Sequence, residues 1–381
     1  MFNLNFTICR INRSILMVIK IVLVVPSLRK TGVTEVVRNL LLQNKVKQCP
    51  VEFSMIVLEN NYSENWNVFK KLVQNFYVLP GKSIISFHKI KKFRDIMKKI
   101  DPDEIHFHGF NSELYIPLVK NKVIVTTAHN MGIEDFIYNY GRFVGNLMAR
   151  CQKCIYKYVS QIVGVSLTVS EHYKSLGFNN IVTIENGVEV PKHVVQNDVL
   201  NGLRHPIGVC VGNVDIRKNT VQILKTFREG HGIGTLLIIG DNPKDKQYFL
   251  NIKNKYQTSN VIFCGRTENV FQFLKGADYF ISASKDEGLP MAAIEAMGEN
   301  LDLILSNIPQ HRELKKSKED NIYFFSNKDQ LIDLLKNYNT QWMAIKNTNN
   351  RQNYLTHFTS SIMFNKYLQL YLDLSEKEKM K

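Results

Sequence analysis

The stretch Ser282–Met297, with the sequence SASKDEGLPMAAIEAM, carries the clearest local pattern in the chain. The apolar run that ends at Ser282 predicts a buried strand, and a polar loop follows it. A helix is expected to open at Pro290, because proline is favoured in the first helical turn. This helix carries Glu295, eight residues after the loop residue Glu287. A buried strand, a loop and a helix in this order form the repeating unit of an α/β fold.

The same stretch predicts a binding site at the mouth of the helix. Its two carboxylates can face one ligand, and carboxylates accept hydrogen bonds from hydroxyl groups. The backbone N–H groups of Gly288 and Leu289 lie at the positive end of the helix dipole and suit an anion. A sugar nucleotide offers both hydroxyls and phosphates. On spacing alone, the alternative is that Glu287 caps the helix and Glu295 is a solvated helix position.

Outward from this stretch, apolar runs alternate with segments of helical periodicity. The predicted strands are Ile19–Val25, Phe53–Leu58, Phe76–Leu79, Glu104–Phe107, Val123–Ala128, Ile162–Val165, Ile181–Ile184, Ile207–Val211, Thr235–Ile239, Val261–Cys264, Tyr279–Ser282 and Leu301–Leu305. The predicted helices are Val33–Asn44, Phe87–Ile100, Arg142–Tyr158, Thr220–Arg228, Lys244–Tyr256, Glu268–Lys275, Pro290–Met297 and Ser360–Leu374. This alternation implies right-handed crossovers and parallel sheets covered on both faces. We therefore expect an α/β protein with two Rossmann-like, doubly wound domains that face a central cleft, where a ligand binds.

The pattern stops once and restarts, which places the domain boundary. The polar segment 189–205 has a proline near each end and predicts a linker. We expect residues 17–188, together with the C-terminal helix 360–375, to form the first domain and residues 206–359 to form the second. Residues 1–16 predict a disordered lead-in, and Met17 is a plausible start because the first strand begins directly after it.

Composition and charge narrow the functional classes. Hydrophobic residues make up 44% and charged residues 22%, which excludes a collagen, a coiled coil or a wholly disordered chain. The net charge is +15, and residues 1–190 carry 24 Lys and Arg against 14 Asp and Glu. The excess favours an anionic partner, unless it is only a solvated lysine surface. The cysteine spacing shows no disulfide framework and fits a reducing cytosol. The apolar stretch Ser14–Pro26 is shorter than the ~20 residues that a spanning helix needs.

The segment EGLPMAAIEAM, from Glu287 to Met297, resembles the E-x7-E signature of retaining glycosyltransferases with the GT-B fold, family 4, also called group 1. Other pieces follow in that family's order from about residue 19 to 375. The resemblance implies that the first domain binds the acceptor and the second binds a nucleotide sugar. It implies that Glu287 contacts the donor sugar and that Glu295 binds the ribose hydroxyls. The donor-binding positions implied beside them are Gly288, Leu289 and Pro290.

The segment Val209–Asn219, VCVGNVDIRKN, matches the family's diphosphate clamp in part. The family has a strand, then glycine, usually arginine, and lysine a few residues on. The resemblance therefore implies that Lys218 is catalytic and stabilises the leaving diphosphate, with Gly212 and Asn213 in the donor site. Asn213 stands where arginine is usual, which puts a two-cation clamp in doubt. Arg217 is an alternative second cation, although adjacent side chains rarely face the same way.

The segment TTAHN, Thr126–Asn130, places His129 at the carboxyl end of a buried strand. The family often has a histidine here, which implies that His129 faces the donor sugar and is catalytic. Two further histidines end the preceding strand, in the sequence HFH, and are expected to pack in the core or the cleft.

The segment PSLRKTGV, Pro26–Val33, lies between the first strand and the first helix. The family usually has two consecutive glycines here, whereas this chain has threonine and then Gly32. The resemblance implies an acceptor or diphosphate loop that contains Gly32, Arg29 and Lys30. Two smaller matches imply donor contacts at Arg266 and Ser284.

Three other patterns are weaker. Asp101-Pro102-Asp103 matches a metal-binding DxD motif, but it precedes a strand and is expected to be a helix-ending turn, so we expect no metal site. Cys151 and Cys154 form a single CxxC pair that is expected to pack within a helix. The basic segment His88–Lys99 predicts either a helix on an anionic membrane surface or a helix packed on the domain with solvated lysines.

The resemblance implies a retaining, metal-independent hexosyltransferase without a cofactor. It would move a hexose or N-acetylhexosamine from a nucleotide diphosphate sugar, UDP-linked by expectation, to a glycan or lipid-linked acceptor of capsule or lipopolysaccharide synthesis. We expect it in the cytoplasm, at the inner face of the plasma membrane, with no nucleic acid as partner. The alternatives are a sugar-nucleotide epimerase of the same fold, a non-catalytic relative, or a nucleic-acid-binding protein suggested by the basic charge.

Overall fold

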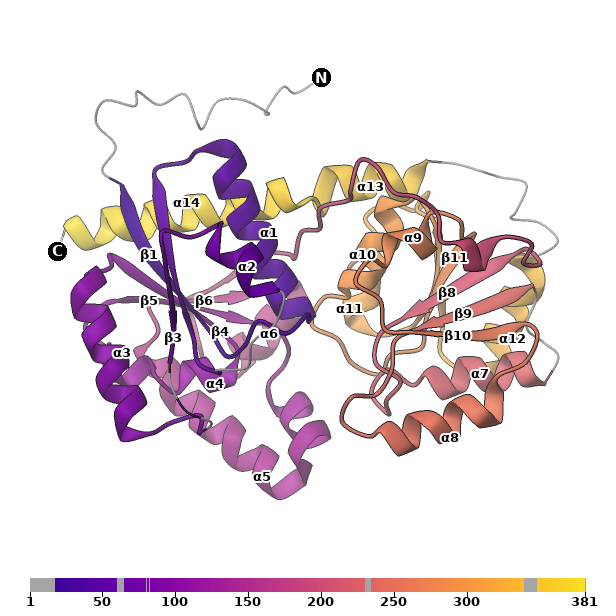
Figure 1. Cartoon of the computed structure of the whole chain (residues 1–381), viewed down its shortest axis with the longest axis horizontal. Helices are drawn as coiled ribbons and strands as arrows, with labels where there is room; N and C mark the ends of the chain where they lie inside the picture. Colours follow the sequence, from indigo (N-terminus) through magenta and orange to yellow (C-terminus); the bar gives the residue numbers. More distant parts are fainter. Residues whose placement is uncertain are drawn as a thin grey trace. The chain divides into compact units, whose positions relative to one another are not determined.

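The structure is a computed structural model that describes residues 18–59, 65–79, 81, 83–229, 234–338 and 348–380. Its residue contacts divide the chain into two compact units (Figure 1). The first unit contains the residues up to Gly187 and those from Ser360 onward, and the second is Val188–Thr359. The second unit is therefore inserted into the sequence of the first.

The first unit is built on a parallel sheet with the strand order β3-β2-β1-β4-β5-β6-β7. The strands are β1 (Ile19–Val25), β2 (Val51–Val57), β3 (Asn75–Val78), β4 (Glu104–His108), β5 (Val123–Ala128), β6 (Gln161–Gly164) and β7 (Ile181–Thr183). All residues of β4 and β5 are buried, as is usual for parallel strands covered on both faces.

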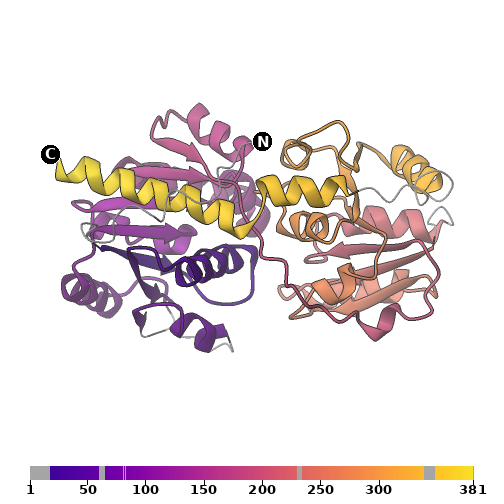
Figure 2. The same ribbon diagram turned by 90° about the horizontal axis from the view of Figure 1, so that it is seen from above.

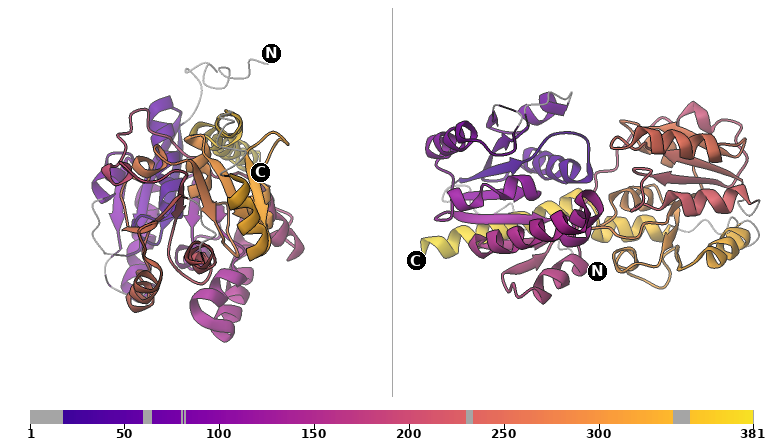
Figure 3. Two further views of the ribbon diagram at one scale, coloured as in Figure 1. Left: turned by 90° about the vertical axis from the view of Figure 1, so that its right-hand side faces the viewer. Right: turned by 90° about the horizontal axis from the view of Figure 1, so that it is seen from below.

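The helices of the first unit are α1 (Gly32–Lys47), α2 (Asn65–Lys70), α3 (Phe87–Ile100), α4 (Phe110–Glu113), α5 (Ile133–Ile155), α6 (Leu167–Ser175) and α14 (Ser360–Lys379). Helix α14 runs alongside α1 on one face of the sheet (Figure 2). On this face Tyr371 of α14 hydrogen-bonds His106 of β4 (2.7 Å) and packs against Phe53 of β2. Figure 3 shows α5 on the opposite face, in front of the sheet in the view from below.

The second unit repeats the design with the parallel strand order β10-β9-β8-β11-β12-β13. The strands are β8 (Ile207–Val211), β9 (Thr235–Ile239), β10 (Val261–Gly265), β11 (Tyr279–Ser282), β12 (Asp302–Ser306) and β13 (Ile322–Phe325). The helices are α7 (Thr220–Arg228), α8 (Lys246–Tyr256), α9 (Phe271–Leu274), α10 (Met291–Gly298), α11 (Pro309–Arg312), α12 (Lys328–Asn337) and α13 (Asn349–His357).

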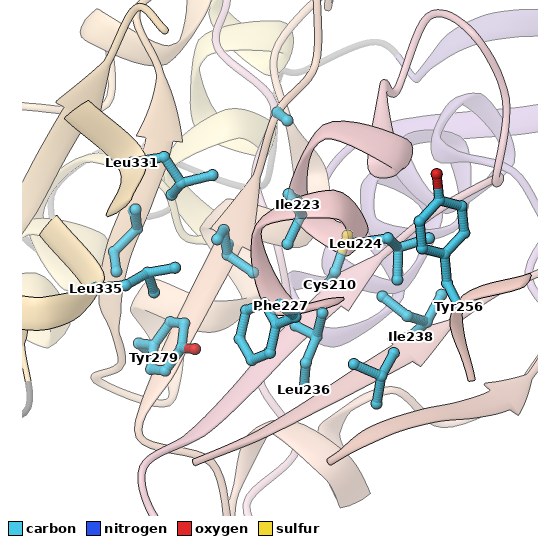
Figure 4. Close-up of a cluster of buried hydrophobic side chains, with 14 of the residues drawn as sticks. Cys210, Ile223, Leu224, Phe227, Leu236, Ile238, Tyr256, Tyr279, Leu331 and Leu335 are labelled. Atoms are coloured by element: carbon cyan, nitrogen blue, oxygen red, sulfur yellow. The ribbon is translucent and has the colours of Figure 1, made fainter. Parts of the chain in front are cut away.

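One buried cluster fills the space between this second sheet and α7, α8 and α12 (Figure 4). Leu236 and Ile238 of β9 face Leu224 of α7, and Leu331 and Leu335 of α12 extend the cluster past the middle of the sheet. Apolar side chains at helical spacing thus pack against every second side chain of the strands. The loops at the strand ends are polar and lie outside this cluster.

The predicted fold class is confirmed, and most predicted strands agree with the structure to within two residues at either end. Seven of the described α-helices and strands were missed: α2, α4, α6, α11, α12, α13 and β13. The predicted helix Arg142–Tyr158 is the second half of α5, which begins at Ile133 and bends at Gly141. The thiols of Cys151 and Cys154 are exposed on α5, so the prediction that they pack inside a helix is wrong.

The segment 189–205, predicted as a linker, lies in the second unit. The backbone N–H of Asn197 donates to the carbonyl of Gln272 (3.0 Å), and Leu200 is buried. These contacts tie the segment to the rest of that unit. The predicted lead-in, residues 1–16, lies outside the described residues. Within the described ranges, no helix is both long and apolar enough to cross a membrane.

Candidate functional site

The candidate site lies where the strand order of the second sheet reverses. Strands β8 and β11 are neighbours, but the chain leaves them toward opposite edges of the sheet. Their carboxyl ends carry the loops 212–219 and 283–290. In open α/β sheets a crevice forms at this point, because successive loops diverge there.

A buried carboxylate with two cations is the centre of the site. The Nζ of Lys218 lies 2.6 Å from Oε1 of Glu287, and Nη1 of Arg217 lies 3.4 Å from its Oε2. The same Nη1 donates to the carbonyl of Asp286 at 2.9 Å. Glu287 is only 6% exposed. Arg217 and Lys218 thus both contact Glu287, and the expectation that these adjacent side chains face different ways is wrong.

The two cations decide the charge state of Glu287. Burial alone would raise the pKa of this carboxyl, but the charges of Lys218 and Arg217 outweigh burial and hold its pKa at about 2. Glu287 is therefore ionised at neutral pH. It does not cap the following helix, since Pro290 is the N-cap of α10 and makes no side-chain capping bond.

Short backbone contacts fix the loops around this ion pair. The backbone N–H of Lys285 donates to the carbonyl of Arg217 (2.9 Å), and the Asp215 carboxylate accepts from the backbone N–H of Lys218 (2.8 Å). Gly212 has a φ of +138°, which favours glycine, and a Cβ there would lie 3.3 Å from Cε of Lys218. The backbone conformation therefore favours the predicted glycine, and a larger residue would also press on the lysine side chain.

The start of α10 provides the expected anion-binding end of a helix. The helix begins at Met291, directly after Pro290, and its first hydrogen bonds run from the N–H groups of Ala293 and Ile294 to the carbonyl of Pro290, so the N–H groups of Met291 and Ala292 have no partner within the helix. Leu289 is buried beside it. Glu295 lies one turn into α10 and is half-buried, whereas the other predicted carboxylate, Glu287, lies on the loop with the cations.

Residues after β12 complete the surroundings of Glu287, and these were not predicted. Gln310 donates to Oδ1 of the buried Asp286 at 2.9 Å. His311 is fully buried, and its Nδ1 lies 2.8 Å from the carbonyl of Ser306. Burial lowers the pKa of His311 to about 4, so the ring is neutral at pH 7. The signal that could have found them is the polar pair Gln310-His311 in the short turn after an apolar strand.

The other predicted donor residues lie on neighbouring loop ends. Arg266 follows β10 and pairs with Asp241 at 2.9 Å. Ser284 is buried and its hydroxyl lies 3.1 Å from that of Ser282. The side chain of Asn213 is exposed and has no hydrogen bond among the described residues. Asn213 therefore does not approach the carboxylate that binds Lys218.

The predicted residues of the first unit lie at the carboxyl ends of its own strands. His129 follows β5 and is half-buried, and its Nε2 lies 3.1 Å from Nδ1 of His108. Burial lowers the pKa of His129 to about 4, and it also lowers the pKa of His106 and of His108. His106 hydrogen-bonds Thr127 at 2.8 Å. The prediction that both histidines of the HFH sequence pack in the core is confirmed.

The loop after β1 replaces a glycine with a helix cap. Thr31 is the N-cap of α1, and its hydroxyl accepts from the N–H of Thr34 while the Thr34 hydroxyl accepts from the N–H of Thr31. Gly32 is the first residue of α1, and its φ is not positive. Arg29 lies 3.7 Å from Glu59, and Lys30 is next to it on the same loop.

The described residues offer no cluster suited to a metal ion. Asp101 pairs with Lys122, and Asp103 accepts from the backbone N–H of Lys20 at 2.8 Å. Asp101 ends α3 in a left-handed conformation, which confirms the predicted helix-ending turn.

Comparison with known proteins follows the same two-part division. Residues 55–191 match the family model described as Glycosyltransferase Family 4, and residues 196–353 match the one described as Glycosyl transferases group 1. The O-antigen biosynthesis glycosyltransferase WclY of Escherichia coli is 25% identical over 309 residues, which cover 77% of this chain and 82% of WclY.

Two solved structures share the fold over nearly the whole chain. Sucrose-phosphate synthase from Thermosynechococcus elongatus has a TM-score of 0.77 at 15% identity, covering 93% of this chain and 99% of that one. Anabaena HepE, solved in complex with UDP and glucose, has a TM-score of 0.75 at 11% identity, covering 93% and 100%. At such identities the likeness shows the fold alone.

Proposed function

Because the chain belongs to the group 1 glycosyltransferases with the GT-B fold, we propose that it transfers a hexose or N-acetylhexosamine from a UDP-linked sugar to a glycan or lipid-linked acceptor, with retention. The observation that carries the proposal is the pair of cations, Arg217 and Lys218, held at the start of α10 where the second sheet reverses its strand order. UDP as the carrier is supported by HepE, whose structure contains it.

The cations and the helix start have complementary tasks in this reaction. Lys218 and Arg217 hold the diphosphate of the donor and stabilise the negative charge that develops as it leaves. The free N–H groups at the start of α10 bind the same phosphates. The leaving oxygen takes the proton of the acceptor hydroxyl on the face of the sugar from which it departs, so the anomeric configuration is kept.

Glu287 keeps the cations in place before the donor arrives. Its carboxylate is ionised and bonded to Lys218, so a diphosphate must compete with it for the lysine. Once Lys218 turns to the diphosphate, the released Glu287 oxygens accept hydroxyl hydrogens of the sugar. Glu295, one turn further along α10, binds the ribose hydroxyls.

We propose that no metal ion takes part, since two fixed cations supply the positive charge at the diphosphate. Activity should therefore persist after dialysis against EDTA. Complete loss that manganese or magnesium restores would contradict this proposal and return attention to Asp101 and Asp103.

The acceptor and the location are proposed from the family and the charge. The name of WclY, O-antigen biosynthesis glycosyltransferase, supports an acceptor of cell-surface polysaccharide synthesis. We propose His129 as a catalytic residue because TTAHN resembles the family's pattern at this position. A growing polysaccharide of this kind is carried on lipid, so we propose that the protein acts in the cytoplasm as a peripheral protein of the inner membrane face.

The test is donor hydrolysis without acceptor, followed by transfer. The purified chain is incubated with UDP-glucose, UDP-galactose and their N-acetylamino counterparts, and released UDP is measured. With the active donor, the product on a lipid-diphosphate-linked sugar is examined by NMR, and an α linkage from an α-linked donor is expected. A β linkage contradicts retention, an altered free UDP-sugar favours the epimerase, and binding of UDP without turnover favours a non-catalytic relative.

A further inference from the structure

Helix α5 is bent into a corner that projects an unusual surface. Gly141, with a φ of +81°, interrupts its helical conformation. The two halves then pack together at Gly145, where a Cβ would lie 2.7 Å from the backbone N of Ile137. Two glycines therefore fix the bend, one by its conformation and one by the close approach of backbone. Figure 1 shows the bend at the lower edge of the first unit.

The side chains at this bend are large, apolar and exposed. We call residues 137–147 the α5 corner. Phe143 is 86% exposed, Leu147 61% and Tyr140 55%. Ile137, Tyr138 and Val144 are also exposed. Single exposed hydrophobic residues are normal on a protein surface, but six within eleven residues of one bend are an unusual concentration of exposed apolar side chains.

The apolar surface continues along the second half of α5 with cations on one border. Phe143, Leu147, Cys151 and Cys154 follow one another at steps of four, four and three, which is one helix face. Arg142, Arg150, Lys153 and Lys157 are all exposed, and at 3.6 residues per turn they lie on one side of that face. Residues 136–160 contain these four cations and no acid.

We propose that the α5 corner inserts its apolar side chains into the interface of an anionic lipid bilayer. An exposed helix face with aromatic and aliphatic side chains beside a row of Arg and Lys is the composition of interfacial helices. Tyrosine and phenylalanine rings suit the boundary between headgroups and acyl chains. A lipid surface satisfies both halves of the pattern, the apolar face and the cations.

The charge pattern argues against a second copy of the chain as the partner. In a symmetric dimer the same surface is used by both copies, so the cations of both copies would gather in one interface. No acid of residues 136–160 could neutralise them. Anionic headgroups neutralise them directly, at ~1 kcal/mol for each Lys or Arg near the surface.

Insertion of the α5 corner would hold the protein at the membrane, and only this biological role rests on the proposed function. The lipid binding itself is measured without any substrate. The full chain is sedimented with vesicles of phosphatidylcholine alone and with vesicles that contain phosphatidylglycerol. We expect binding to the anionic vesicles. The double variant Phe143→Ser/Leu147→Ser should bind at least about tenfold more weakly than the parent, because two exposed apolar side chains no longer transfer into lipid.

Matched controls separate this effect from a general loss of surface hydrophobicity. Leu250 and Leu355 are each 47% exposed in the second unit, so Leu250→Ser/Leu355→Ser should bind as the parent does. Insertion is read out by Phe143→Trp, whose added fluorescence should be quenched by lipids brominated on their acyl chains, against the parent as background.

Two results would overturn the proposal. The first is equal vesicle binding by Phe143→Ser/Leu147→Ser and the parent. The second is a dimer of the parent in solution that this variant abolishes, which would show that another copy covers the corner. Donor hydrolysis in solution should be the same in parent and variant, since none of these residues belongs to the proposed site. If the parent itself shows no donor hydrolysis, that result would count against the proposed function and not against insertion into lipid.

Discussion

Glu287, Lys218 and Arg217 form one ion-paired group, to which we assign both donor binding and stabilisation of the leaving diphosphate. The carboxylate is nearly fully buried and ionised, so removing one cation leaves its charge half compensated, and removing both would leave a buried charge that water cannot solvate. In the proposed reaction the donor diphosphate replaces this carboxylate as the anion that Lys218 binds, so we expect the same three side chains to act with different pairings before and after the donor binds.

Replacement of the two carboxylates should affect different kinetic constants. Glu295→Ala should raise KM for the donor, because the ribose hydroxyls lose an acceptor, and Glu287→Ala should mainly lower kcat. A hydrogen bond to a charged group contributes ~1.5–3 kcal/mol, so each change should be about tenfold or more. Steady-state UDP release measures both, and circular dichroism checks folding. Unchanged constants in two folded variants would refute the assigned roles.

The position of Arg217 predicts a rescue. Arg217→Ala should lower kcat/KM for the donor about tenfold or more, because one of the two cations at the diphosphate is lost. Asn213→Arg in the same chain should restore part of the activity, since Asn213 is exposed on the same loop and has no hydrogen bond among the described residues that this change would break. Arg228→Ala, on α7 outside the loop, is the control. If Arg217→Ala retains full activity, Lys218 alone holds the diphosphate.

At the scale of elements, α1 and α5 show two uses of the loop–helix junction. In α1 a Thr31–Thr34 capping box ties the start of the helix, so the loop that carries Arg29 and Lys30 keeps one shape without the usual pair of glycines. In α5 the helix begins without a side-chain cap after Gly132 and bends again at Gly141. The first junction is fixed by hydrogen bonds and the second by backbone conformation.

Helix α3 exposes four of its lysines to water and buries its apolar face. Phe93, Ile96 and Met97 are buried against the first unit, whereas Lys91, Lys92, Lys98 and Lys99 are exposed. The sequence left open whether the apolar face meets a membrane, and the packing shows that it meets the protein. Apart from Phe87 at its start, which is exposed, α3 therefore offers a membrane its charges and not its apolar face.

Changing these four lysines to glutamine should therefore weaken binding to anionic vesicles at low salt. Each lysine near an anionic surface contributes ~1 kcal/mol, and the effect should vanish at 1 M salt, where the Debye length is ~3 Å. Vesicle sedimentation at two salt concentrations measures it. Lys244, Lys246, Lys253 and Lys255 of the second unit, changed to glutamine together, provide a control with the same change in net charge. Equal losses in the two variants would show that only the net charge matters.

The elements predicted from the sequence are those with a strong apolar period, such as β1, β5 and β8, whose predicted bounds agree with the structure. β13 (Ile322–Phe325) was missed because it is a short apolar run between polar segments, which periodicity alone does not assign. The helix that follows it, α12, was missed with it. In the site, Glu287 and Lys218 came from a motif, and the structure brings them together. The side chain of Arg217 was misjudged because alternation of side-chain direction holds in a strand and not in the loop 212–219.

At the scale of the whole molecule, three buried histidines and the half-buried His129, all neutral at pH 7, should make stability depend on pH. Burial lowers the pKa of His106 to about 3, of His129 and His311 to about 4, and of His108 in the same direction. In the unfolded chain each titrates near 6.5, so between that value and the folded values only the unfolded state gains protons. Their contribution is complete above pH 6.5 and is lost as pH falls toward about 4.

Urea unfolding at pH 7, 6 and 5 should therefore show a falling free energy of unfolding, by up to ~1.4 kcal/mol per pH unit for each such histidine. His106→Gln should be less stable at pH 7 and less sensitive to pH. His193→Gln, at an exposed position, should keep the slope of the parent. Glu287 acts in a lower window, between its ordinary 4.5 and about 2, because its folded pKa is depressed. A slope that His106→Gln leaves unchanged would show that the buried histidine does not contribute.

The return of α14 to the first unit has a consequence for synthesis on the ribosome. Tyr367 and Tyr371 reach Thr127 and His106 in the middle of the first sheet, yet they are translated after all of residues 188–359. At typical elongation rates this leaves part of one face of the nascent first sheet uncovered for roughly 10 to 35 seconds. The second unit, whose chain is continuous, completes its core first. A chaperone that binds apolar surface on ribosome-bound chains should therefore be released from this protein only when its last helix emerges.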